Sequence, residues 1–106
     1  MQVIATKITQ NPAIVKFELD EIIVRTQNFE FKNIDETQNS PLAKQLFYLP
    51  FVKTVYISGN FIAIEKFSIV EWEDVQEDVA NQINDFIANG GEIIKIEENK
   101  TKKQPI

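Results

Sequence analysis

Residues 52–66 predict a β-hairpin and read Val52-Lys53-Thr54-Val55-Tyr56-Ile57-Ser58-Gly59-Asn60-Phe61-Ile62-Ala63-Ile64-Glu65-Lys66. Two runs rich in β-branched and aromatic residues flank Gly59-Asn60, a typical two-residue hairpin turn. With this turn Ile57 opposes Ile62, and opposed residues share a face of the sheet. One face then carries only aliphatic side chains, those of Val55, Ile57, Ile62 and Ile64. A slip of one residue would scramble this sorting, so we expect the aliphatic face to cover the core.

The other face of the hairpin is mixed and carries Thr54, Tyr56, Ser58, Phe61, Ala63 and Glu65. Tyr56 and Phe61 are candidates for a partner-docking patch, because aromatic residues are enriched at the centres of interfaces. Two other interpretations stay open at this point. The N-terminal segment covers these two rings, or they are scattered surface aromatics without a role.

The chain before the hairpin predicts strands and one short helix. Residues 13–19 and 28–32 alternate between apolar and polar side chains, as half-buried strands do. Residues 3–8 predict a short strand or arm, and residues 22–24 form a brief apolar segment of ambiguous type. Ser40-Pro41 then indicates an N-cap and the first position of a helix of about two turns.

A second helix follows the hairpin. Ser68-Ile69-Val70-Glu71 fits a capping box, although the helix start can also lie one turn later. Gly90-Gly91 predicts the end of this helix. Residues 92–96 predict either a short strand or the start of a linker. One apolar stripe along the helix is formed by Trp72, Val75, Val79, Ile83, Phe86 and Ile87.

The element order predicts an α+β domain of ββαββα type, an antiparallel β-sheet with two helices packed on one face. We expect the domain to span residues 1–96 and residues 97–106 to form a flexible tail or linker. At 106 residues the chain has room for one such domain.

Composition excludes several functions. The chain has no Cys and no His, so it has no thiolate or imidazole ligand, no Cys nucleophile and no His general base. We find no active site and expect a protein that is not an enzyme. A net charge of −5 argues against a nucleic-acid partner.

No apolar run approaches the roughly 20 residues of a membrane span, and no secretory signal is visible, so we expect a cytoplasmic protein without a membrane partner.

Two further features allow a functional and a structural interpretation. Five carboxylates crowd the second helix start: Glu71, Glu73, Asp74, Glu77 and Asp78. They suggest a cation site or partner surface, but acids also favour a helix N-terminus through its dipole, and this second interpretation is preferred. Trp72 suggests a ligand platform, but at the head of an apolar stripe we expect it to anchor the core.

Four stretches together resemble the N-terminal domain of the Nfu/NifU-like iron–sulfur cluster scaffold proteins. They have the order and spacing typical of that family and cover about residues 6–91. They are Thr9-Gln10-Asn11-Pro12-Ala13-Ile14-Val15-Lys16-Phe17, Ser40-Pro41-Leu42-Ala43-Lys44-Gln45-Leu46-Phe47, Val52-Lys53-Thr54-Val55-Tyr56-Ile57-Ser58-Gly59-Asn60-Phe61-Ile62, and Trp72 with Ile83, Phe86 and Ile87.

The resemblance implies a non-catalytic accessory domain that aids target recognition in cluster assembly and delivery. In the family a Cys-x-x-Cys pair in a separate C-terminal domain holds the cluster, and no residue of this chain matches those ligands. We therefore expect no cofactor on this chain, iron–sulfur client or assembly proteins as partners, and a Cys-x-x-Cys domain following residues 97–106. The alternative is a free-standing protein–protein interaction module unrelated to iron–sulfur chemistry.

Overall fold

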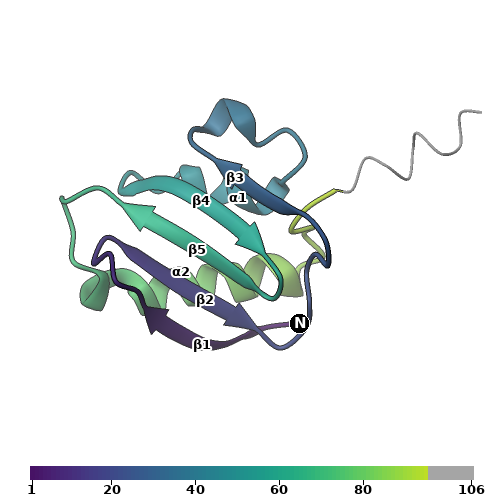
Figure 1. Cartoon of the computed structure of the whole chain (residues 1–106), viewed down its shortest axis with the longest axis horizontal. Coiled ribbons are helices and arrows are strands. Elements are labelled where there is room, and N and C mark those ends of the chain that lie inside the picture. Colours follow the sequence, from purple (N-terminus) through teal and green to yellow (C-terminus); the bar gives the residue numbers. More distant parts are fainter. Residues whose placement is uncertain (96–106) are drawn as a thin grey trace, which may run out of the picture.

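The computed structural model describes residues 1–95, which form one antiparallel sheet with two helices on one face (Figure 1). The strands are β1 (Val3–Ile8), β2 (Ile14–Leu19), β3 (Asn28–Phe31), β4 (Val52–Ser58) and β5 (Phe61–Lys66). The helices are the 3-10 turn η1 (Ile34–Glu36), α1 (Pro41–Phe47) and α2 (Trp72–Ala88). The sheet order is β1-β2-β5-β4-β3.

The predicted α+β class with a helical layer is confirmed. Three strands precede α1, one more than the ββαββα order contains, because residues 3–8 form a full strand paired with β2. The predicted tail or linker at residues 97–106 lies outside the described residues. No helix within residues 1–95 is both long enough and apolar enough to cross a bilayer.

The β4–β5 hairpin has the predicted register. Ile57 pairs with Ile62 and Val55 pairs with Ile64, and these four side chains are fully buried. Gly59 supports the turn with a φ of 54°, a left-handed conformation that glycine adopts without a Cβ penalty. The hairpin therefore supplies part of the sheet face that packs against the core.

Strand β2 extends this apolar face along the sheet. It pairs with β5, so that Phe17 lies beside Ile62, and its inward side chains Val15, Phe17 and Leu19 are all buried. The helices cover this side, with Leu42 and Leu46 from α1 and Val79 and Ile83 from α2 in the same cluster. The core thus lies between the sheet and the two helices.

The ambiguous segment at residues 22–24 is not a strand. The backbone N–H groups of Ile23 and Val24 both donate to the Gly59 carbonyl, over 2.8 and 3.2 Å. Val24 is buried there, whereas Ile22 is exposed. The connection from β2 to β3 therefore passes around the β4–β5 turn, which lets β3 reach the far edge of the sheet.

Ser40 caps α1 as predicted and also holds the segment that follows α2. Its Oγ accepts a hydrogen bond from the Ala43 N–H (3.1 Å) and donates one to the Ile93 carbonyl (2.6 Å). The Lys95 N–H donates to the Asn39 carbonyl (2.7 Å). Residues 92–95 therefore cross the start of α1 without forming a strand. Of the two alternatives for residues 92–96, the strand is wrong over residues 92–95, because the partner that these residues find is a helix N-terminus instead of a sheet edge.

Helix α2 begins one turn after the capping-box serine. Its N-cap is Glu71, whose side chain makes no capping hydrogen bond, and Ser68 lies outside the helix in an exposed turn. A start at Ser68 is therefore wrong and the later start is right. The helix ends as predicted, with Gly90 at a φ of 89°. Gly91 passes so close to the Phe86 ring that a Cβ there would collide with it.

We expect the substitution Ser40→Ala to destabilise the domain by about 1–3 kcal/mol, because it leaves the Ala43 N–H and the Ile93 carbonyl without partners in a buried site. Urea unfolding measures this loss. Hydrogen exchange at the Ala43 amide should accelerate as well. The matched control Ser68→Ala removes an exposed hydroxyl that caps nothing and should change stability by less than about 0.5 kcal/mol. Equal effects of the two substitutions would contradict the capping role.

Candidate functional site

The face of the sheet opposite the helices carries the two predicted docking residues. Tyr56 on β4 and Phe61 on β5 are half-buried, and their ring centroids lie 6.1 Å apart at an interplanar angle of 35°. In Figure 1 this face of the sheet is turned toward the viewer, with α1 and α2 behind it. The N-terminal strand β1 pairs at the edge of the sheet beside β2 and does not cover the two rings.

A lysine completes this surface. The Lys16 ammonium lies 4.4 Å from the centroid of the Phe61 ring, within the range of a cation–π contact. Lys16 reaches the ring because β2 pairs with β5, where Lys16 is the partner of Ala63. We call Lys16, Tyr56 and Phe61 the aromatic patch. No sequence pattern indicated this lysine, because its place depends on the order of the strands.

Ion pairs border the aromatic patch. Lys7 and Glu18 approach to 3.2 Å on one side, and Lys53 and Glu65 to 3.8 Å on the other. Both pairs are partly exposed, so each contributes little to stability. A surface with an apolar centre and a charged rim is typical of protein interfaces.

Trp72 anchors the core, as the stripe on α2 predicts. It is buried, and its ring makes edge-to-face contacts with Phe17 and Phe51 at centroid distances of 5.8 and 6.3 Å. Its indole N–H donates to the Ala13 carbonyl over 2.8 Å. The ring is therefore enclosed by protein and offers no platform to a ligand.

The five carboxylates near the start of α2 are all exposed. Within residues 1–95, no three His, Cys, Asp or Glu side chains are grouped so as to hold a metal ion. Glu73 and Asp74 lie in the first turn of α2, where the positive end of the helix dipole favours them. This placement fits the structural interpretation of the cluster.

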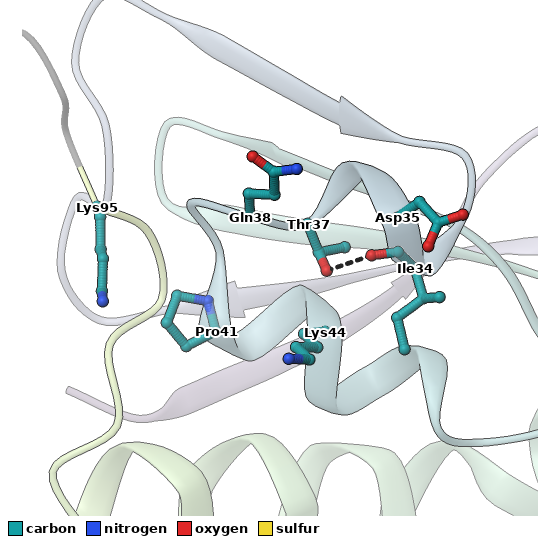
Figure 2. Close-up of a pocket in the computed structure, with 7 residues that line it drawn as sticks. All are labelled: Ile34, Asp35, Thr37, Gln38, Pro41, Lys44 and Lys95. Atoms are coloured by element: carbon teal, nitrogen blue, oxygen red, sulfur yellow. Dashed lines mark hydrogen bonds between the residues drawn. The ribbon is translucent and has the colours of Figure 1, made fainter.

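A cavity of about 540 Å³ lies where the η1 turn, α1 and the C-terminal segment meet (Figure 2). The hydroxyl of Thr37, which lines the cavity, donates to the Ile34 carbonyl over 2.7 Å, so its proton is already engaged in a hydrogen bond. Lys44 and Lys95 line the cavity from α1 and from the C-terminal segment, and Asp35 lines it from η1. No local sequence pattern indicates this cavity, because Lys95 lines it only where residues 92–95 cross the start of α1.

A family model and several known proteins match this chain. Residues 4–90 match the family described as the N terminal of scaffold protein Nfu/NifU. The chain belongs to this family. The Drosophila willistoni protein named NFU1 iron-sulfur cluster scaffold homolog, mitochondrial, is 34% identical over 82% of this chain and 30% of its own length. The human protein of the same name is 33% identical over 82% of this chain and 35% of its own.

Solved structures support the same Nfu/NifU assignment. A NifU-like protein from Saccharomyces cerevisiae is 25% identical and superposes with a TM-score of 0.74, over 89% of this chain and 86% of that one. Protein SAV1430 from Staphylococcus aureus shares the fold, with a TM-score of 0.67 over 78% of this chain and 99% of that one at 22% identity. The chain spans about a third of the length of the curated relatives.

The side chains of this Nfu/NifU domain do not fit an iron–sulfur cluster. Clusters are held by Cys thiolates, with His as an occasional substitute, and this chain contains neither residue. Carboxylates are hard ligands and replace thiolates poorly. The aromatic patch offers two rings and an ammonium, none of which is a cluster ligand.

We expect the chain to remain colourless after anaerobic reconstitution with ferrous iron and sulfide, because it contains neither the Cys nor the His residues that hold such clusters. Visible absorbance, with iron and sulfide analysis after desalting, measures the outcome. The human scaffold homologue taken through the same procedure is the positive control. Stoichiometric iron and sulfide retained by this chain would contradict the argument from ligand chemistry.

Proposed function

We propose that this Nfu/NifU domain is a non-catalytic accessory domain that recognises iron–sulfur client or assembly proteins while another domain carries the cluster. The observation that carries this proposal is the combination of membership in a cluster-scaffold family with a chain that contains neither Cys nor His. A domain of such a protein that cannot hold the cluster can still contribute through the surface it presents.

The aromatic patch is the surface that best supports recognition. Tyr56 and Phe61 supply large apolar contact area at low entropic cost, and the ring of Phe61 is already in contact with the Lys16 ammonium. The core does not need either side chain, because the opposite face of the same strands is filled by aliphatic residues. Their position is therefore free to serve binding.

The alternative function is a free-standing protein–protein interaction module unrelated to iron–sulfur chemistry. Both functions would use an exposed surface, so the identity of the bound proteins distinguishes them. The human and Drosophila relatives are named mitochondrial. The cytoplasmic location suggested by this sequence stays a prediction, as does the absence of nucleic-acid and membrane partners.

We expect the double substitution Tyr56→Ser, Phe61→Ser to weaken client binding and leave the fold intact, because both rings lie outside the core. The measurement is affinity capture from extracts of the source organism, followed by mass spectrometry. Proteins with known iron–sulfur clusters should be enriched on the unmodified chain and reduced at least severalfold on the variant.

The matched control is Thr54→Ala with Ser58→Ala, which changes two small residues on the same face of β4 and should retain the captured proteins. Loss of cooperative unfolding in the serine variant would show that the two rings are part of the core. An enriched set without iron–sulfur proteins would favour the free-standing interaction module.

A further inference from the structure

A second hollow lies on the helical side of the molecule, away from the aromatic patch. It forms between α2 and the chain that follows α1 and has a volume of about 160 Å³. Pockets for small molecules usually measure about 300–1,000 Å³, so this one has room for a single side chain. It is lined by Leu49, Phe51, Val75, Asp78, Val79 and Gln82.

One residue that lines this hollow, Gln82, carries an unsatisfied acceptor. The side-chain oxygen Oε1 of Gln82 is buried and accepts no hydrogen bond, the only buried side-chain polar atom of this kind within residues 1–95. A buried acceptor without a donor destabilises the folded chain, because it has lost its hydrogen bond to water and gained none in return. The terminal amide of glutamine turns easily about its last torsion angle, so Oε1 can be directed to a donor that enters the hollow.

The charge around the hollow has one sign. Asp78, one turn before Gln82 on α2, lines the hollow with an exposed carboxylate that forms no ion pair with any described residue. Helix α2 contains no Lys or Arg, and its other carboxylates are Glu73, Asp74, Glu77 and Asp85. A cationic side chain is therefore the charged group that this surface favours.

The chain flanking the hollow exposes further apolar surface. Tyr48, next to Leu49, is 62% exposed, and Phe67 is 46% exposed. Phe67 is held beside the hollow, because its N–H donates to the carbonyl of Phe51 over 2.8 Å. A partner segment that inserts one side chain would find apolar contacts at the rim.

We propose that this hollow, which we call the arginine groove, binds an arginine side chain of a partner protein. The aliphatic stem would lie against Val75, Val79 and Phe51, and the guanidinium would donate to the carboxylate of Asp78 and to Oε1 of Gln82. Arginine fits better than lysine, because its planar fork of five N–H donors serves two acceptors at once. The groove and the aromatic patch lie on opposite sides of the sheet, so one partner at each can bind simultaneously.

The test uses the isotope-labelled chain and three blocked peptides, acetyl-Ser-Leu-X-Leu-Ser-amide. X is arginine, citrulline, which keeps N–H donors but loses the charge, or norleucine, which loses both. Titration followed by amide chemical shifts should perturb Val75, Val79 and Gln82 with the arginine peptide. Affinity should fall by about two- to fivefold with citrulline, the range of an exposed ion pair, and further with norleucine.

Two substitutions separate the contributions. Asp78→Asn should bring the arginine peptide close to the affinity of the citrulline peptide. Gln82→Leu should reduce the difference between citrulline and norleucine, because it leaves the Asp78 carboxylate as the one remaining acceptor for the citrulline N–H groups. Glu77→Gln is the matched control: it removes the neighbouring charge on α2 from a residue that does not line the groove, and it should leave all three affinities unchanged.

Several outcomes would overturn the proposal. One is equal affinity for the three peptides, and another is an effect of Glu77→Gln equal to that of Asp78→Asn. Perturbation confined to Tyr56 and Phe61 would place the peptide on the aromatic patch instead. Concentration-dependent self-association that protects the groove would make a second copy of this chain its occupant.

Discussion

The pairing of Ile57 with Ile62 across the β4–β5 turn is the constraint on which the rest of the domain depends. It places four aliphatic side chains on one face, each contributing about 1.5–3 kcal/mol through burial. Together they are comparable with the whole stability of a domain this size, about 5–15 kcal/mol. A slip by one residue between the two strands would mix the two faces and bring either Tyr56 or Phe61 under the helices, so the same pairing sets both the core and the aromatic patch.

The elements that the sequence predicted are those specified by neighbouring residues. The hairpin register follows from Gly59-Asn60, the start of α1 from Ser40, and the end of α2 from Gly90. Contacts between distant segments set the features that were missed or ambiguous. The apolar segment at residues 22–24 is of ambiguous type by sequence, and in the structure the N–H groups of Ile23 and Val24 donate to the Gly59 carbonyl. Residues 92–95 contact the start of α1 instead of a sheet edge. No local pattern encodes either pairing.

The candidate sites also differ in whether their residues are near or distant along the chain. Tyr56 and Phe61 could be placed together on one face because they belong to a single hairpin, and the structure brings their rings to 6.1 Å. Lys16 comes from β2 and joins them only through the sheet order. The arginine groove combines α2 with the chain after α1, so its residues give no signal as a group. Sequence therefore predicts sites within one hairpin better than sites that join segments distant along the chain.

The hydrogen bonds at the end of the described chain bear on how the domain works. Ser40 and Asn39 hold the backbone of Ile93 and Lys95 against the start of α1, so whatever follows Lys95 starts from a fixed point. On the function proposed above, a domain without Cys or His affects a cluster through what it binds and where it holds that partner. The fixed position of the Ile93 and Lys95 backbone helps to define where a bound partner is held. A group tethered at this point would reach that partner at an effective concentration set by the tether. On the proposed function, recognition by this domain would thus raise the rate of a transfer whose chemistry takes place on another domain.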